Sequence, residues 1–76
     1  MNQKRREKLK RAVALLEEAS DITSAALDDE RDCLYNMPEN LQDSERCEKM
    51  EQAVDKLEEA LEQIDSAREC IEEASE

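Results

Sequence analysis

Apolar residues recur at three- and four-residue steps through the first half of the chain, the spacing of one face of an α-helix. The pattern predicts a helix over residues 2–35. The expected inward face consists of Leu9, Ala12, Val13, Leu16, Ala19, Ser20, Thr23, Ala26, Leu27, Leu34 and Met37. Leu15, Ile22 and Cys33 widen this face on one flank. Because the apolar arc is wider than one antiparallel neighbour needs, a second partner surface is expected.

The second half of the chain carries a heptad pattern that predicts a helix over residues 44–75. Its apolar seam consists of Cys47, Met50, Val54, Leu57, Leu61, Ile64 and Ile71. An alanine stands at every seventh position beside the seam, at Ala53, Ala60, Ala67 and Ala74. Small residues let helices approach closely, so this row is expected to face a neighbouring backbone. Arg68 interrupts the seam, and its guanidinium is expected to reach solvent or Glu17.

Residues 36–43 between the two helices read as a bend, because they hold the only proline and several turn-forming residues. The second helix has two possible starts, at Pro38 or near Asp43 and Ser44; the later one is favoured, with a short helical turn over Pro38 to Leu41. A short connection makes the helices antiparallel, with residues level when their numbers add to about 81. The predicted fold is all-α: one antiparallel two-helix coiled-coil hairpin over residues 1–76, dimerising into a four-helix assembly.

The composition predicts a small core that needs a partner or a cross-link to be stable. Of the 76 residues, 38% are hydrophobic and 43% are charged, so the chain can bury a seam but no broad core. No stretch is apolar enough to cross a bilayer, and the charged N-terminal residues do not resemble a signal peptide. We therefore expect no membrane contact and a cytoplasmic location.

Three cysteines, without histidine or a Cys-x-x-Cys motif, indicate neither a disulfide framework nor a zinc site. They are expected to be reduced thiols, with Cys33 and Cys47 buried. Cys33 and Cys47 are level near the bend, so a disulfide between them under oxidation stays geometrically open. Cys70 is expected on the outer face of the second helix.

Charge is distributed unevenly along the chain, whose net charge is -11. Residues 1–11 carry six bases and one acid, whereas residues 43–76 carry thirteen acids and four bases. In a hairpin the two ends lie side by side, so Lys4, Arg5, Lys8 and Arg11 are expected to pair with residues 69–76. A phosphate or nucleic-acid contact by this basic head is the alternative.

No catalytic, cofactor-binding or metal-ligating residues are expected, and we interpret the chain as a protein that is not an enzyme. Residues 28–39 place acids at some positions of a calcium loop, but Cys33 stands where the sharp turn needs glycine. Paired carboxylates such as Glu58 and Glu59 lack a concave, desolvated setting for acid–base chemistry.

The acidic second helix is instead a candidate partner surface, formed by Glu48, Glu51, Asp55, Glu58, Glu59, Glu62 and Asp65. It carries one net negative charge per roughly 5 to 6 Å, whereas duplex DNA carries one per about 1.7 Å of axis, too large a difference for a close duplex mimic. The surface favours a protein partner with a basic surface, and no direct nucleic-acid contact is expected. The candidate oligomer interface for a homodimer is Leu15, Ala19, Ile22 and Ala26.

A resemblance to known proteins rests on the bend and on two segments that follow it. These are Tyr35-Asn36-Met37-Pro38-Glu39-Asn40-Leu41-Gln42-Asp43-Ser44-Glu45-Arg46, Met50-Glu51-x-Ala53 and Leu57-Glu58-x-Ala60-Leu61-Glu62. The chain resembles small acidic helical-hairpin proteins of unassigned function from phages and prophages of Firmicutes. The resemblance implies a phage accessory protein that binds and inhibits a host or defence protein in the host cytoplasm. A structural or oligomerisation subunit of a phage or cellular assembly, without an inhibitory role, is the alternative.

Overall fold

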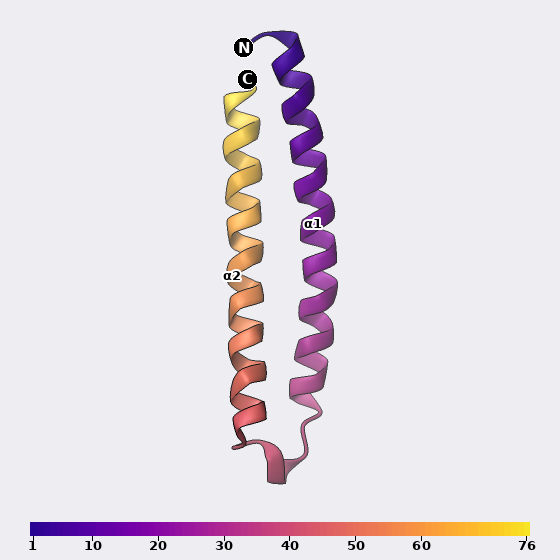
Figure 1. Cartoon of the computed structure of the whole chain (residues 1–76), viewed down its shortest axis with the longest axis vertical. Helices are drawn as coiled ribbons and strands as arrows, with labels where there is room; N and C mark the ends of the chain where they lie inside the picture. Colours follow the sequence, from indigo (N-terminus) through magenta and orange to yellow (C-terminus); the bar gives the residue numbers. More distant parts are fainter.

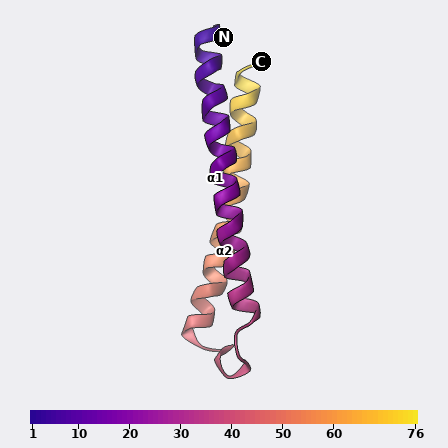
Figure 2. The ribbon, with the colours of Figure 1, turned by 90° about the vertical axis from the view of Figure 1, so that its right-hand side faces the viewer.

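The computed structural model describes residues 1–76 as an all-helical hairpin. Its elements are α1 (Gln3–Tyr35), the short 3-10 helix η1 (Glu39–Leu41) and α2 (Glu45–Ala74). The two long helices lie side by side and run in opposite directions, with both termini at one end and the bend at the other (Figure 1). The molecule is a narrow rod of 59 × 15 × 13 Å, and Figure 2 shows the helices crossing at a shallow angle.

Side-chain caps explain where the helices begin. The Asn2 side chain accepts a hydrogen bond from the Arg5 backbone N–H at 2.9 Å, and α1 starts at the next residue, Gln3. Ser44 does the same for α2, accepting from the Cys47 N–H at 3.2 Å while its hydroxyl donates to the Leu41 carbonyl at 2.6 Å. Such caps satisfy backbone donors that have no partner inside a helix. The later of the two expected starts of helix two is thus the one the chain adopts.

Pro38 separates η1 from α1. Its backbone is extended, with φ -57° and ψ 145°, and its ring nitrogen cannot donate the hydrogen bond that would continue α1. The Pro38 carbonyl accepts from the Leu41 N–H at 2.9 Å, which closes the helical turn expected at Pro38 to Leu41. The chain therefore reverses over about nine residues without any left-handed backbone conformation.

The core is a seam one side chain thick. Only three residues are buried: Leu27 at 3% exposure, Cys47 at 3% and Val54 at 8%. The other seam positions, such as Leu16 and Leu61, are half-buried. Two helices can bury only the stripe along which they touch, so most of each helix stays in solvent.

The register of the two helices differs from the expected one by about one helical turn. Glu17 and Arg68 form an ion pair at 3.6 Å, and Val13 and Glu72 line one cavity, so level residues have numbers that add to about 85 rather than 81. Residues 36–38, which end in the extended Pro38, carry the chain past the end of α1 before it turns back. As a result α2 reaches further toward the bend, and the N-terminus extends past the C-terminus (Figure 1).

This register overturns the expected pairing of the basic head with residues 69–76. Lys4, Arg5, Lys8 and Arg11 take part in none of the five ion pairs in the structure. Residues level with Glu76 lie near residue 9, so the first turns of α1 project beyond the end of α2. The basic head therefore forms no ion pair in its own chain.

The alanine row of α2 faces the neighbouring helix over only half its length. Ala53 and Ala60 are half-buried as expected, but Ala67 and Ala74 are exposed. A seven-residue repeat drifts by about 20° per heptad around a straight helix. The row therefore starts at the edge of the seam near the bend and turns toward solvent at the open end.

Candidate functional site

The seam divides the hairpin surface into two broad faces. Arg31 follows the half-buried Glu30, and Glu58 follows the seam residue Leu57. The two form a hydrogen-bonded ion pair across one side of the seam. Antiparallel helices are related by a local two-fold axis, so residues at equivalent heptad positions lie on the same side. The positions directly after the seam therefore lie together on the side of Arg31, and the positions directly before it lie together on the opposite side.

The side that carries Arg31 is an acidic face built by both helices. Along the middle of the rod it consists of Glu17, Asp21 and Asp28 on α1 and Glu48, Glu51, Asp55, Glu58, Glu62 and Asp65 on α2, and all nine are exposed. Glu69, Glu72 and Glu76 continue it toward the open end. Six of the seven acids predicted from the sequence as a partner surface belong to it. The three acids of α1 were not among the residues predicted from the sequence. Aligning the heptads of the two helices would have placed them on the same side as the acids of α2.

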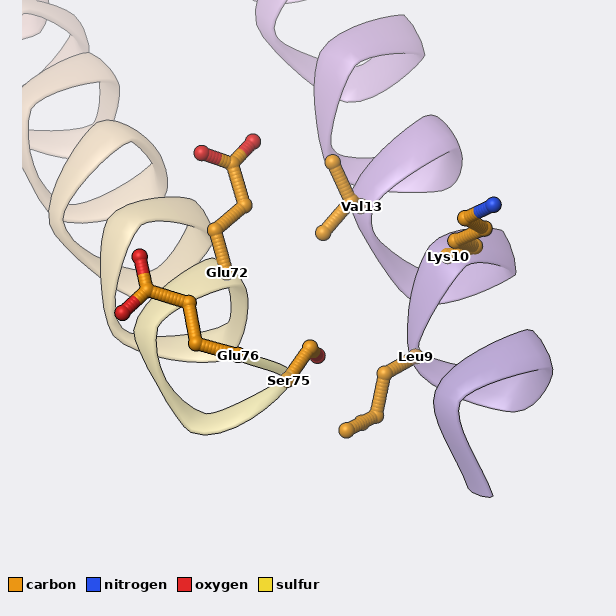
Figure 3. A pocket seen from close by; sticks show the side chains of 6 residues that line it. All are labelled: Leu9, Lys10, Val13, Glu72, Ser75 and Glu76. Atoms are coloured by element: carbon orange, nitrogen blue, oxygen red, sulfur yellow. The ribbon is translucent and has the colours of Figure 1, made fainter. Parts of the chain in front are cut away.

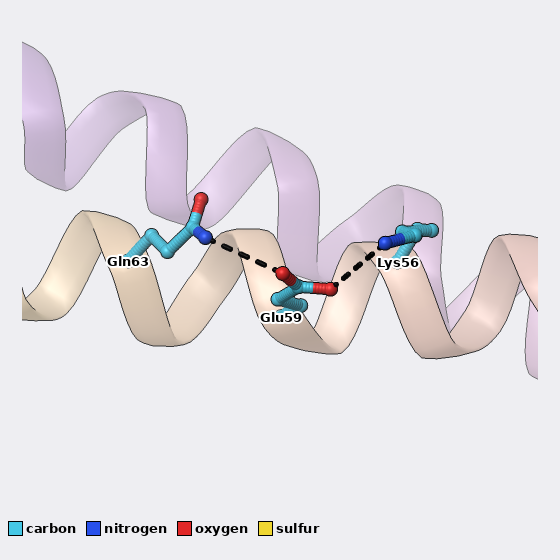
Figure 4. A network of polar contacts seen from close by, with 3 residues as sticks. All are labelled: Lys56, Glu59 and Gln63. Atoms are coloured by element: carbon cyan, nitrogen blue, oxygen red, sulfur yellow. Dashed lines mark hydrogen bonds and ion pairs between the residues drawn. The ribbon is translucent and has the colours of Figure 1, made fainter.

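Glu59 is the predicted acid that lies elsewhere. It stands at the outermost position of α2, where one carboxylate oxygen accepts from Lys56 at 3.2 Å and the other accepts from the Gln63 amide at 3.5 Å (Figure 4). These are contacts within one helix surface. Glu59 is therefore engaged by its own helix and lies apart from the acidic face.

Two arginines compensate part of the acidic face. Arg31 pairs with Glu58, and the half-buried Arg68 pairs with Asp65 at 2.7 Å and with Glu17 at 3.6 Å, which confirms the expected reach of Arg68 to Glu17. Arg31 with Glu58 and Arg68 with Glu17 thus link the two helices across the seam. No group of three histidine, cysteine, aspartate or glutamate side chains is placed to hold a metal ion.

The opposite side is an alanine face. It consists of Ala12, Ala19 and Ala26 on α1 and Ala53, Ala60 and Ala67 on α2, with Leu15 and Ile22 along its outer edge on α1. Leu15 is 54% exposed and Ile22 is 64% exposed. All four residues of the predicted oligomer interface lie on this face. Ala26 is exposed, so its expected place in the inward face is wrong: it precedes the seam residue Leu27 and sits on its edge.

A small open cavity of about 280 Å³ lies between the helices at the open end (Figure 3). Leu9 and Val13 line it from α1, together with Glu72, Ser75 and Glu76, whereas the Lys10 ammonium points away. The seam position opposite Leu9 is Ser75, which is too small to fill the space between the helices. The cavity is thus an unfilled end of the seam, with apolar walls and a carboxylate rim.

Cys47 is the one cysteine in the core, and all three cysteines are free. Burial raises the pKa of the Cys47 thiol above its ordinary value of 9.0, and the carboxylates of Glu51, Asp43 and Glu48 raise the pKa further. The Sγ atom lies 3.8 Å from the Glu51 carboxylate. Cys33 and Cys70 are exposed, which confirms the expectation for Cys70 and shows that the expected burial of Cys33 is wrong. A thiol held neutral in this way is a poor nucleophile.

Alkylation should therefore separate the three thiols. With iodoacetamide at pH 8, we expect Cys33 and Cys70 to react at least about ten-fold faster than Cys47, because only the exposed thiolate attacks. Peptide mass spectrometry over time measures the three rates, and the same reaction in urea, where the rates should converge, is the control. Equal rates in the native protein would contradict the burial of Cys47.

The raised pKa also sets a pH dependence. Below pH 9.0 the thiol is protonated in the folded and unfolded chain, so the Cys47 contribution to stability is fully present. Above that value the unfolded chain loses the proton while the folded chain keeps it, so the contribution declines until the folded thiol also titrates.

Comparisons of this chain with protein-family models, with curated proteins and with solved structures gave no match. Neither long helix combines the length and the apolar character that crossing a membrane requires.

Proposed function

We propose that the protein is a non-enzymatic protein–protein interaction module whose acidic face binds a protein partner with a basic surface. The acidic face carries the proposal: nine exposed carboxylates from two helices lie on one side of a rigid rod. Such a field attracts a basic partner over distances comparable to the Debye length and orients it before contact. Arg31 and Arg68 pair with three of these carboxylates and leave the others without an ion pair, available to a partner.

A nucleic-acid-handling protein is the partner class that fits this surface. Such proteins carry clefts of lysine and arginine that neutralise phosphates, and carboxylates on a narrow rod can occupy them. The rod is 15 × 13 Å in cross-section, narrow enough to enter a cleft. Together with the resemblance of the bend to phage and prophage proteins, this leads us to propose a phage accessory protein that inhibits a host or defence factor in the host cytoplasm.

Charge reversal on the acidic face tests this function. Asp55 and Glu62 are exposed and form no ion pair, so the variant Asp55→Lys with Glu62→Lys changes the face without breaking the hairpin. In affinity capture from host lysate at low and moderate salt, the captured proteins should be basic and should elute as salt increases. The variant should weaken their binding by about ten-fold or more.

The matched control is Glu18→Lys with Glu73→Lys, which changes the net charge equally at two exposed positions outside the acidic face. This control should retain binding within about two-fold. Equal losses in both variants would mean that only total charge matters, and capture that is insensitive to salt and to both variants would contradict the proposed role of the acidic face.

A structural or oligomerisation subunit is the second candidate function, favoured by the exposure of Leu15 and Ile22 on the alanine face. We include in the proposal a homodimer through Leu15, Ala19, Ile22 and Ala26, which makes a four-helix assembly. The two functions differ in salt response, because association led by apolar contacts persists at salt concentrations that release a charged partner.

A further inference from the structure

The hairpin exposes more surface than a folded chain of its size usually does. Its accessible surface is 6074 Å², whereas a monomer of 8.8 kDa is expected to expose about 4,800 Å². The excess of about 1,300 Å² exceeds the roughly 800 Å² that each partner buries in a stable interface of standard size. One second copy laid along the alanine face would cover surface of this order.

The outer edge of the alanine face is a strip of four residues spaced seven apart along α1: Lys8, Leu15, Ile22 and Asp29. The strip reads basic, apolar, apolar and acidic from the open end toward the bend. Lys8 and Asp29 are both exposed and form no ion pair in their own chain. When two copies of the strip lie antiparallel, Lys8 of each faces Asp29 of the other and Leu15 of each faces Ile22 of the other. The strip is therefore complementary to an inverted copy of itself.

We propose that a second copy covers the alanine face with its bend at the opposite end, so that the two α1 helices are antiparallel. Leu15 of each chain then packs on Ile22 of the other, and Lys8 of each chain lies against Asp29 of the other. The inference rests on the homodimer proposed above and fixes its orientation. It also brings the basic head, which forms no ion pair in its own chain, close to the acids near the bend of the second copy, such as Asp32.

Other antiparallel alignments of the two strips are worse. A shift of one heptad in one direction places Leu15 against itself and Ile22 against Lys8, and a shift in the other direction places Leu15 against Asp29. A parallel pair of α1 helices would set Lys8 against Lys8 and Asp29 against Asp29. Like charges in contact and a charge facing an apolar side chain both weaken association.

The strongest competing dimer has both bends at the same end, with each α1 against α2 of the other copy. The register of the hairpin then places Asp29 against Lys56, Ile22 against Gln63 and Leu15 against Cys70. This arrangement sets Ile22, the most exposed aliphatic side chain, on a polar amide. Lys56 is moreover already paired with Glu59 in its own helix (Figure 4).

Charge-swap variants distinguish the two orientations, with the dimer dissociation constant measured by sedimentation equilibrium at low salt. Lys8→Glu and Asp29→Lys should each weaken the dimer by roughly ten-fold, since symmetry converts two attractive pairs into two repulsive ones. The double variant Lys8→Glu with Asp29→Lys restores both pairs and should return the constant to within about three-fold of the original. Lys56→Glu, which changes the net charge as much as Lys8→Glu does, should leave it unchanged.

Each outcome decides between the orientations. Asp29→Lys makes the chain less acidic, so its weakening of the dimer cannot come from general repulsion between negatively charged chains. Weakening by Lys56→Glu, no effect of Lys8→Glu, or failure of the double variant to recover would overturn the proposed orientation while the unaltered chain still dimerises. A monomeric unaltered chain would overturn the homodimer itself. Circular dichroism verifies that every variant remains helical.

Discussion

The Leu27→Ala variant is expected to lose about 3 kcal/mol of unfolding free energy, the cost of removing a buried leucine side chain and leaving a cavity. Leu27 is 3% exposed and is one of only three buried residues, so no second layer of core compensates for the loss. A chain of this size has a total stability of about 4 to 11 kcal/mol. Urea titration followed by circular dichroism should show a midpoint lower by several molar, or a chain largely unfolded in buffer.

Leu41→Ala is the matched control, since it removes the same side chain from an exposed position in η1, with 39% exposure. It should cost less than about 1 kcal/mol. Chain concentration must be equal in all titrations, because a dimer adds a concentration-dependent term to stability. Similar midpoints for the two variants would contradict a hairpin held together by the seam around Leu27 and Val54.

Leu15→Glu and Ile22→Glu should each convert the dimer into folded monomers. By symmetry each substitution places two carboxylates in the interface and removes two apolar contacts, which should weaken association by at least about 100-fold. Both side chains face solvent in the single hairpin, so its helicity should persist. Light scattering measures the mass of each variant, and circular dichroism measures its helix content.

Gln52→Glu and Ser66→Glu add the same negative charge at exposed positions on the outer surface of α2 and serve as controls. They should leave the mass unchanged. Intact dimers in Leu15→Glu and Ile22→Glu would show that the interface does not lie on the alanine face. Loss of helix in these variants would contradict the exposure of the two side chains.

The helices and the bend could be predicted from the sequence because the signals for them are local. Proline stops α1 whatever surrounds it, and Ser44 can cap α2 through its own side chain. The apolar spacing likewise located the seam, including all three buried residues, because a helix turns by a fixed angle per residue. The predicted reach of Arg68 to Glu17 is confirmed as well.

The register and the basic head could not be predicted in this way. The register depends on how far the chain travels between Tyr35 and Ser44, and hence on backbone angles that the residue types do not fix. Moving α2 by one turn leaves the basic head beyond Glu76. The contribution of Asp21 and Asp28 to the acidic face depends on the same alignment of two helices, so a reading of α2 alone misses it.

The two faces give the hairpin separate surfaces for two kinds of association. The alanine face is apolar and suits a second copy, while the acidic face points away from it and stays free in the proposed dimer. Both surfaces come from one heptad pattern, with alanine before the seam positions and acids after them. A dimer would therefore present two acidic faces on opposite sides, which raises the effective concentration for a partner that has two basic sites.

The central claim is that a second copy covers the strip left bare beside the seam, and the mass of the unaltered protein in solution tests it most directly. Light scattering at micromolar and higher chain concentrations, at low and high salt, should give twice the chain mass of 8.8 kDa, with the dimer persisting at high salt because its interface is led by apolar contacts. A fully helical protein that keeps a mass of 8.8 kDa at every concentration would contradict the account.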